Sequence, residues 1–255
     1  MKRTDRVEER NKSITETICH IFEENKQRYG VRRVCHEQVN RGFHITHKRV
    51  QRIMHALKLY GKRPKEKYHS YKGEVGKVAG NIIQRNFKAD RPLQKWTTDV
   101  TQFHFSWGKC YLSPILDMNT NEIISYDLSM IPNLNQIKRM LNRAFKKFRN
   151  LQGLIMHSDQ GWQYQHEYYR SELKKHGIIQ SMSRKGNCYD NSIMETFFGR
   201  MKNEMYYGSE KEYTSFKVFA KAVKEYIHYF NKERIQKKTK WMPPEIYRET
   251  STNAI

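Results

Sequence analysis

The stretch KWTTDVTQFHFSWGKCYLSPILDM, residues 95–118, is rich in threonine, valine and aromatic residues and contains the turn-like sequence SWGK. This composition is typical of two β-strands joined by a hairpin. A third strand, EIISYDLSM, follows the turn NTN, so we expect three consecutive antiparallel strands. Asp99 falls in the middle of the first strand, where an aspartate is disfavoured. Burying its charge is costly unless another group compensates it.

Strands and helices alternate after this hairpin. A helix (NLNQIKRMLNRAFKKF), a short strand (LIMHSD), a helix (HEYYRSELKKHG) and a short strand (IIQSM) are followed by two more helices. This order predicts a mixed α/β sheet with flanking helices. We expect this α/β core at residues 95–235 and a C-terminal tail at 236–255.

The N-terminal residues 1–61 read as three short helices separated by glycines. The third helix has Thr46 as a plausible N-cap, and its apolar residues share one face. Its basic residues lie mostly off that face, as in the recognition helix of a helix-turn-helix module. A small helical bundle with a solvated basic face is the alternative. The residues expected to contact DNA are Lys48, Arg49 and Arg52.

Charge favours a nucleic-acid partner. The chain has 48 Lys and Arg against 26 Asp and Glu, a net charge of +22. Such a field favours a polyanion, first nucleic acid and second an acidic membrane surface. Residues 62–94 read as a basic linker that could lie along a phosphate backbone. No apolar run has the length of a membrane-spanning helix and no signal peptide is evident, so we expect a cytoplasmic protein without membrane contact.

The four cysteines are scattered without a C-x-x-C pair, which predicts neither a disulfide framework nor a structural zinc site.

Two aspartates stand where an α/β sheet gathers reactive groups. Asp99 lies within the first expected strand, and Asp159 ends the fourth, where LIMHSD stops at a turn. A divalent cation such as Mg²⁺ takes oxygen ligands from one or two carboxylates and would compensate a buried aspartate. Asp159 could instead be a turn former. Three further aspartates are available, namely Asp117, Asp127 and Asp190.

One acidic residue stands out in SMSRKGNCYDNSIMETFFGRMKNEM, residues 181–205. This stretch predicts a loop followed by an amphipathic helix. Glu195 shares a polar face with Lys202, seven positions later, because a helix turns by about 100° per residue. The same glutamate also fits a capping box with Ser192 as N-cap. Asp190 lies about 140° round such a helix from Glu195, so it reads as a loop or cap residue.

Three ordered motifs carry a family resemblance. TTDVTQF, HSDQGWQY and GNCYDNSIMETFFGRMKNE together resemble the signature of the DDE transposase and retroviral-integrase superfamily. Thirty-five residues separate Asp159 from Glu195, the spacing of that superfamily. Within it, the chain resembles the integrase-core proteins of the IS-three family of bacterial insertion sequences. YGVRRVCHEQVNRG and YIHYFNKERIQKKTKWMPPEIY extend the likeness to nearly the whole chain.

The resemblance implies a ribonuclease H-like fold with Asp99, Asp159 and Glu195 as catalytic metal ligands. It implies two Mg²⁺ or Mn²⁺ ions, cleavage of DNA 3′ ends and strand transfer by two-metal phosphoryl transfer. The rival functions are another ribonuclease H-like nuclease or resolvase, and an inactive transposase-derived DNA-binding regulator.

Further contacts and partners follow from the same resemblance. Lys202 is placed to touch DNA phosphate, or else is a solvated lysine paired with Glu195 or Glu204. Arg184 and Lys185, in the loop before the helix, are expected to guide DNA. The expected partners are the element's DNA ends and target DNA, further copies of the chain on DNA, and a helix-turn-helix product of an upstream reading frame.

Overall fold

The computed structural model describes residues 3–62, 78–184 and 188–252. They belong to two compact units, Met1–Lys65 and Glu66–Ile255.

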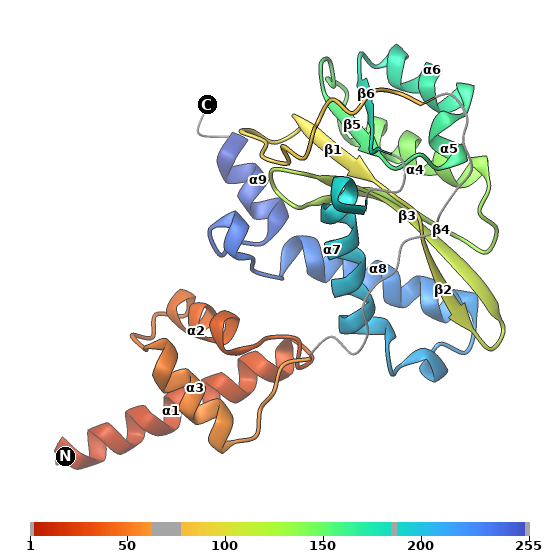
Figure 1. The fold of residues 1–255 in the computed structure, drawn as a ribbon. Helices are drawn as coiled ribbons and strands as arrows, with labels where there is room; N and C mark the ends of the chain where they lie inside the picture. Colours follow the sequence, from red (N-terminus) through yellow and green to blue (C-terminus); the bar gives the residue numbers. More distant parts are fainter. Residues whose placement is uncertain (1–2, 63–77, 185–187, 253–255) are drawn as a thin grey trace. The chain divides into compact units, whose positions relative to one another are not determined.

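The first unit contains the three predicted helices, α1 (Arg3–Glu24), α2 (Val31–Asn40) and α3 (His47–Ala56) (Figure 1). Helices α1 and α2 are tied together by a buried hydrogen bond: Nε2 of Gln38 in α2 donates to the Ile14 carbonyl of α1 at 3.0 Å. Thr46 occupies the N-cap position of α3 as predicted, but its side chain makes no capping hydrogen bond. The buried apolar side chains of this unit include Ile14, Ile18, Ile21, Val34, Val50 and Met54.

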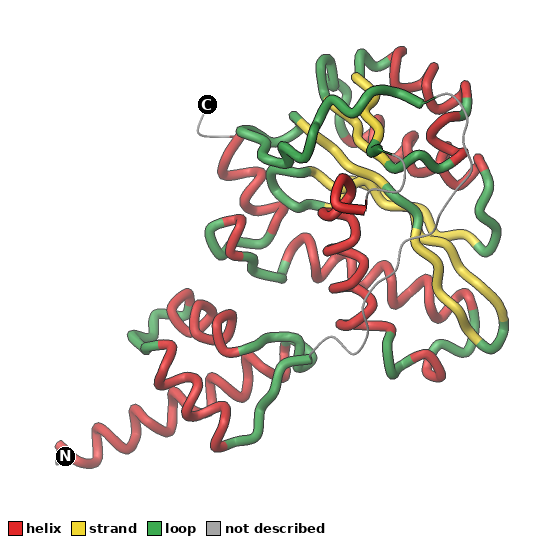
Figure 2. Tube along the Cα trace, in the orientation of Figure 1, coloured by secondary structure: helices red, strands yellow, loops and turns green. Residues whose placement is uncertain are grey.

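The second unit is built on one mixed sheet (Figures 1 and 2). Strand β3 pairs antiparallel with β4 on one side and with both β1 and β2 on the other. Strands β1, β5 and β6 are parallel neighbours in that order. The strands are β1 (Lys95–Thr98), β2 (Thr101–Phe105), β3 (Gly108–Asp117), β4 (Ile123–Ser129), β5 (Ile155–Ser158) and β6 (Ile179–Met182).

The first predicted strand is in fact two. The sequence predicted Asp99 within a single strand, whereas β1 ends at Thr98 and β2 begins at Thr101. The Asp99 carboxylate accepts a hydrogen bond from the Val100 N–H at 2.7 Å, a local bond that competes with ladder pairing. Pro114 of β3, which has no N–H to donate, lies opposite this break. The gap leaves Asp99 at a strand end.

Helices cover both faces of the sheet. Thr98 faces α4, since its hydroxyl lies 3.7 Å from the Met140 sulfur, and Thr97 on the opposite face contacts Asn191, which precedes α7. Phe103 packs edge-to-face with Phe219 of α8. The helices of this unit are α4 (Leu134–Lys147), α5 (Trp162–Gln165), α6 (Glu167–Lys175), α7 (Ser192–Met201), α8 (Phe216–Lys232) and α9 (Pro244–Thr252).

Helix α7 differs from its sequence prediction at both ends. Its N-cap is Asn191 rather than Ser192, and the predicted capping box is absent. The reason is that the Asn191 side chain is engaged with the sheet. At its C-terminus α7 passes directly into a π-helical turn, η2 (Lys202–Tyr206), so the α-helical period stops at Met201.

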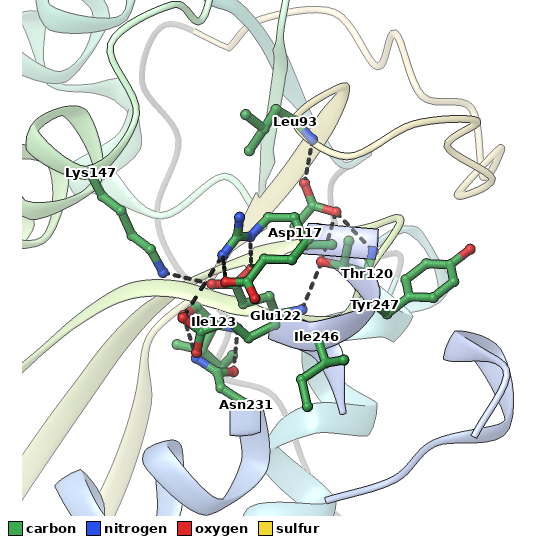
Figure 3. Close-up of polar contacts among 12 residues, drawn as sticks. Leu93, Asp117, Thr120, Glu122, Ile123, Lys147, Asn231, Ile246 and Tyr247 are labelled. Atoms are coloured by element: carbon green, nitrogen blue, oxygen red, sulfur yellow. Dashed lines mark hydrogen bonds and ion pairs between the residues drawn. The ribbon is translucent and has the colours of Figure 1, made fainter. Parts of the chain in front are cut away.

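Segments outside the expected core pack against it. Ile83 and Ala89, from the expected linker, form a small buried cluster with Met118. In the tail, Arg248 of α9 pairs with buried Glu122 at 2.6 Å. Figure 3 shows Glu122 together with Lys147, which lies 2.6 Å from the same carboxylate. In the described residues, no helix is long and apolar enough to cross a membrane.

Candidate active site

Register brings Asp99 and Asp159 to one edge of the sheet. Strands β1 and β5 are parallel, with Thr97 paired to His157. Two residues further along each strand come Asp99 and Asp159, so the two carboxylates lie at neighbouring strand ends. Such ends are where α/β sheets place their ligands.

The Asp99 carboxylate is buried, at 7% exposure, and fixed by two donors. Its Oδ1 accepts from the Val100 N–H at 2.7 Å, and its Oδ2 accepts from the Asn191 side-chain amide at 2.9 Å. The Asn191 side-chain oxygen also lies 3.3 Å from the Thr97 hydroxyl. The sequence alone gave no sign that the amide of Asn191 reaches the first strand.

Asp159 is fixed by the turn that follows β5. Its Oδ1 accepts from the Gly161 N–H at 2.9 Å. A Cβ on Gly161 would lie 3.0 Å from that oxygen and 2.5 Å from the Gln163 side chain, so only glycine fits this turn without rearrangement. The turn-forming role considered for Asp159 is therefore real and coexists with its place beside Asp99.

Glu195 completes the group electrostatically. It lies on α7 and is half-buried, and burial raises the pKa of its carboxyl. Burial, the neighbouring Asp159 charge and the Glu195 charge raise the pKa of Asp99 well above its usual range, against its two hydrogen bonds. Burial likewise raises the pKa of Asp159. Asp99 is thus within electrostatic reach of the other two acids predicted from sequence.

No cation offsets this negative charge. Within the described ranges, no lysine, arginine or histidine forms an ion pair with Asp99, Asp159 or Glu195. Over the same residues, no three His, Cys, Asp or Glu side chains lie close enough together to hold a metal ion. Asp99 and Asp159 thus end neighbouring strands without an ion-pair partner among the described residues, and in this structure the three acids do not converge closely enough to hold a metal ion together. An oxygen-rich, cation-free cluster suits a hard divalent cation.

The loop before α7 is organised by Asp190. The side chain of Asp190 is 1% exposed and pairs with Arg184 and Arg85, both at 2.9 Å. Arg184, predicted to guide DNA, is therefore committed to Asp190 although its side chain is 58% exposed. Lys185, predicted for the same role, lies outside the described residues.

Lys202 does not occupy the exposed position that helical periodicity predicted. It is buried, its Nζ donates to the Gln102 carbonyl at 2.9 Å, and it lies 5.2 Å from the Phe103 ring centre. Burial lowers its pKa to about 8. The ammonium group therefore packs against β2 rather than standing in solvent, because η2 begins at this residue and ends the α-helical period on which its expected exposure was based. Its contact with DNA stays a prediction.

The predicted DNA-contacting residues of α3 are partly available. Lys48 and Arg52 are exposed. Arg49 is half-buried, and its guanidinium donates to the Asn11 side chain of α1.

Acidic side chains at adjacent ends of a mixed sheet, with a helix-borne glutamate beside them, define a ribonuclease H-like core of the integrase kind. The family models agree. Residues 89–188 and 195–251 both match models described as an integrase core domain, and residues 8–67 match an HTH-like domain.

Relatives extend over nearly the whole chain. The chain is 47% identical over 235 residues to a putative transposase for insertion sequence element IS150 of Escherichia coli, covering 92% of this chain and 82% of the relative. It is 54% identical over 209 residues to a transposase-like protein of Haemophilus influenzae, covering 82% and 95%. The chain belongs to the integrase-core transposases of bacterial insertion sequences. It is a transposase, and thus a polynucleotidyl transferase.

Solved structures confirm the fold. The HTLV-2 integrase catalytic core domain, in its trimeric form, matches with a TM-score of 0.51 at 14% identity, covering 63% of this chain and 99% of that one. A chain of the simian T-cell lymphotropic virus intasome matches with a TM-score of 0.50 at 13% identity, and the match spans 75% of this chain and 63% of that chain. The predicted helix-turn-helix-like module and ribonuclease H-like core are both confirmed.

Proposed function

We propose that Asp99, Asp159 and Glu195 are the catalytic carboxylates of this transposase and that together they hold two Mg²⁺ or Mn²⁺ ions. The observation that carries the proposal is geometric: buried Asp99 and Asp159 end neighbouring parallel strands, and Asn191, just before the helix that bears Glu195, donates to Asp99. The raised pKa of Asp99, caused by burial and by the neighbouring acids, agrees with it. A site that accumulates uncompensated negative charge is suited to take up divalent cations. The solved HTLV-2 core, which shares the fold, is in complex with magnesium.

The residues fit such a metal pair by their chemistry. Asp99 and Asp159 offer carboxylate oxygens at adjacent strand ends, and Asn191 and Gly161 hold one oxygen of each in a fixed direction. Glu195 is the half-exposed member of the group, free to approach the other two when their charge is neutralised. When bound, the ions supply Lewis acidity at the scissile phosphate and lower the pKa of the attacking hydroxyl.

The reaction proposed for this site is cleavage of the element's DNA 3′ ends followed by strand transfer. In-line attack by water, and later by the freed 3′-hydroxyl, needs the phosphodiester to lie across the edge formed by Asp99 and Asp159. Asp99 and Asp159 would orient the metal ions along this edge, with Glu195 beside them on α7.

DNA contact is proposed for both units. In the first unit, the exposed Lys48 and Arg52, with Arg49 beside them, are proposed to bind the element's ends. In the second unit, Arg184 and Lys185 are proposed to contact the backbone near the site, with Arg184 held by Asp190 while it does so. We propose that the active form is a homo-oligomer on DNA and that a helix-turn-helix product of an upstream frame assists it.

The test uses a supercoiled plasmid that carries the element's own ends. With Mg²⁺, and with the upstream-frame product supplied, the wild-type chain should nick the ends and join them to target DNA. The Glu195→Gln variant should bind the ends with unchanged affinity and yield neither product. Nicking without joined products would instead identify a nuclease or resolvase. A wild-type chain that binds DNA but neither cuts nor joins it would indicate a regulator.

A further inference from the structure

One carboxylate outside the proposed metal site has an unusually complete set of donors. Asp190 lies in η1 (Cys188–Asn191), immediately before α7, and its side chain is 1% exposed. Its two oxygens accept five hydrogen bonds of 2.9–3.0 Å. The donors are Asn81 Nδ2, Arg85 Nε, the Arg184 N–H, Arg184 Nε and Arg184 NH2.

These donors come from two segments that are far apart in sequence. Asn81 and Arg85 belong to the segment that precedes β1, and Arg184 follows β6. The hydrogen bonds from Arg184 hold the pKa of the Asp190 carboxyl well below its usual range, so the group stays ionised at any pH where DNA is processed. Asp190 thus ties the start of α7 to two fixed points of the core.

The backbone of Asp190 is fixed as well. The imidazole of His157, buried in β5, donates from Nε2 to the Asp190 carbonyl at 2.9 Å. Its Nδ1 lies 2.9 Å from the hydroxyl of Ser181, and that hydroxyl accepts from the Ile82 N–H at 3.0 Å. Because the Asp190 carbonyl can only accept, Nε2 carries the proton and the Ser181 hydroxyl donates to Nδ1.

The residue that follows Asp190 touches the proposed metal site. The Asn191 amide donates to Asp99 Oδ2 at 2.9 Å, and Glu195 lies four positions later on α7. We propose that Asp190 is a positioning residue for catalysis: it locks η1 so that the Asn191 amide orients the Asp99 carboxylate and α7 presents Glu195 to it. This inference rests on the proposed function, because it assigns Asp190 a task at that site.

The expected consequence is a defect in metal binding rather than in folding alone. Groups that orient metal ligands typically change metal affinity by about 10–100-fold when they are removed. Asp190→Asn keeps the shape of the side chain but removes the charge that holds Arg184 and Arg85. We expect it to raise the Mn²⁺ concentration for half-saturation by about 10-fold or more.

The chain provides a matched control. Asp127 of β4 is also a buried carboxylate, 4% exposed, and it also pairs with two arginines, Arg139 at 2.7 Å and Arg143 at 2.9 Å. It holds α4 against β4, on the face of the sheet away from Asn191. Asp127→Asn therefore removes an equivalent ion cluster without touching the proposed site.

The experiment measures Mn²⁺ binding to the full chain without DNA by isothermal titration calorimetry, together with the melting temperature of each variant. Asp190→Asn should bind Mn²⁺ about 10-fold or more weakly than wild type. Asp127→Asn should lose similar thermal stability and bind Mn²⁺ normally. Normal Mn²⁺ binding by folded Asp190→Asn would overturn the proposal, as would an equal loss in both variants. If wild type binds no Mn²⁺, the proposed metal site itself fails and takes this inference with it, whereas a defect confined to Asp190→Asn supports both.

A second variant keeps the test decisive if Asp190→Asn does not fold. Arg85→Gln removes one donor from a side chain that is 47% exposed, and it should weaken Mn²⁺ binding in the same direction by a smaller factor. A double-mutant cycle then tests whether the hydrogen bonds to Asp190 affect metal binding through Asn191. If they do, Arg85→Gln combined with Asn191→Ala should bind Mn²⁺ no more weakly than Asn191→Ala alone. Additive losses of Mn²⁺ affinity would show that they do not act through Asn191.

Discussion

Two groups of buried acids in the same sheet differ in what surrounds them. At the β3–β4 end, Glu122 is fully buried and meets Lys147 and Arg248, each at 2.6 Å (Figure 3). Asp117 beside it accepts hydrogen bonds from five donors, including the Leu93 N–H and the Trp96 indole. At the β1–β5 edge, Asp99 has two donors and two acidic neighbours.

The difference separates acids that hold the fold from the acids that we propose bind metal ions. Both groups carry the desolvation penalty of a buried charge. At Glu122 the cations Lys147 and Arg248 offset this penalty. At Asp117 five hydrogen bonds offset part of it, and burial still raises the pKa of that carboxyl. At Asp99 two hydrogen bonds oppose burial and two acidic neighbours add to it, so the pKa of that carboxyl rises well above its usual range. Incomplete compensation is thus a better indicator of the reactive site than burial alone.

The largest expected effect lies at the uncompensated group. Asp99→Asn should reduce end cleavage by at least about 10³-fold, because removing one member of a catalytic constellation costs about that much or more. DNA binding should be unchanged in a gel-shift assay. An Asp117→Asn variant that remains folded should retain cleavage, because Asp117 lies in the compensated group. Loss of cleavage in that folded variant would erase the distinction between the groups.

Removing an acid of the compensated group should instead lower the free energy of unfolding. Glu122→Gln leaves Lys147 and Arg248 without their carboxylate, so the free energy of unfolding should fall. A fully buried pair would lose about 3–5 kcal/mol, and we expect about 2–3 kcal/mol because Lys147 remains 36% exposed. Urea denaturation followed by circular dichroism measures the loss. A change below about 0.5 kcal/mol, typical of surface substitutions, would show that the cluster contributes little.

The folded protein should instead become more stable when one charge of the uncompensated group is removed. In the presence of a chelator at pH 7, Asp99→Asn should raise the melting temperature by about 2–4 °C, which corresponds to about 1 kcal/mol in a domain of this size. The folded-state pKa of Asp99 is raised, so wild type loses stability as the pH rises through the interval between its unfolded and folded pKa values. The advantage of the variant should therefore vanish near pH 4.

Divalent cations provide the control for this prediction. Mg²⁺ should raise the melting temperature of wild type and leave that of Asp99→Asn nearly unchanged, because the ion takes over the missing compensation. A lower melting temperature for the variant in chelator would mean that Asp99 is already well satisfied.

The smallest effect concerns a buried cation. Lys202 donates to the Gln102 carbonyl and lies over the Phe103 ring, and burial lowers its pKa to about 8. The unfolded chain binds more protons than the folded one between this value and the ordinary lysine pKa, so stability should rise with pH there. Wild type should gain about 1 kcal/mol between pH 8 and pH 10 relative to Lys202→Met. Parallel stability profiles would contradict the buried position of Lys202.

Sequence reasoning located the elements and the three acids, because strand composition, helix period and the motif spacing are local signals. It could not choose among the aspartates on physical grounds, since Asp99, Asp117, Asp127 and Asp190 all read as acids near strands or helix starts. Their roles depend on partners distant in the chain, such as Asn191 for Asp99.

Three local predictions failed for reasons that sequence does not carry. The break at Asp99 depends on a bond between its own carboxylate and the next N–H, and Lys202 lies where the helix widens to a π turn. The Ser192 capping box failed because Asn191 took the cap position while its side chain was drawn to the sheet. In each case a hydrogen bond or a change of helix type, which the local sequence pattern does not show, decided the structure.

The hydrogen bonds to Asp190 and from Asn191 can form only late in the synthesis of the chain. Asn81 and Asp190 are 109 positions apart, and Asp99 and Asn191 are 92 apart. Contacts over such separations carry a large loop-closure cost and form late in folding. A chain still being synthesised displays Asp99 and Asp159 well before Asn191 and Glu195 exist. An unfinished chain therefore lacks part of the proposed site. Only completed chains could then cut or join DNA close to the place of translation.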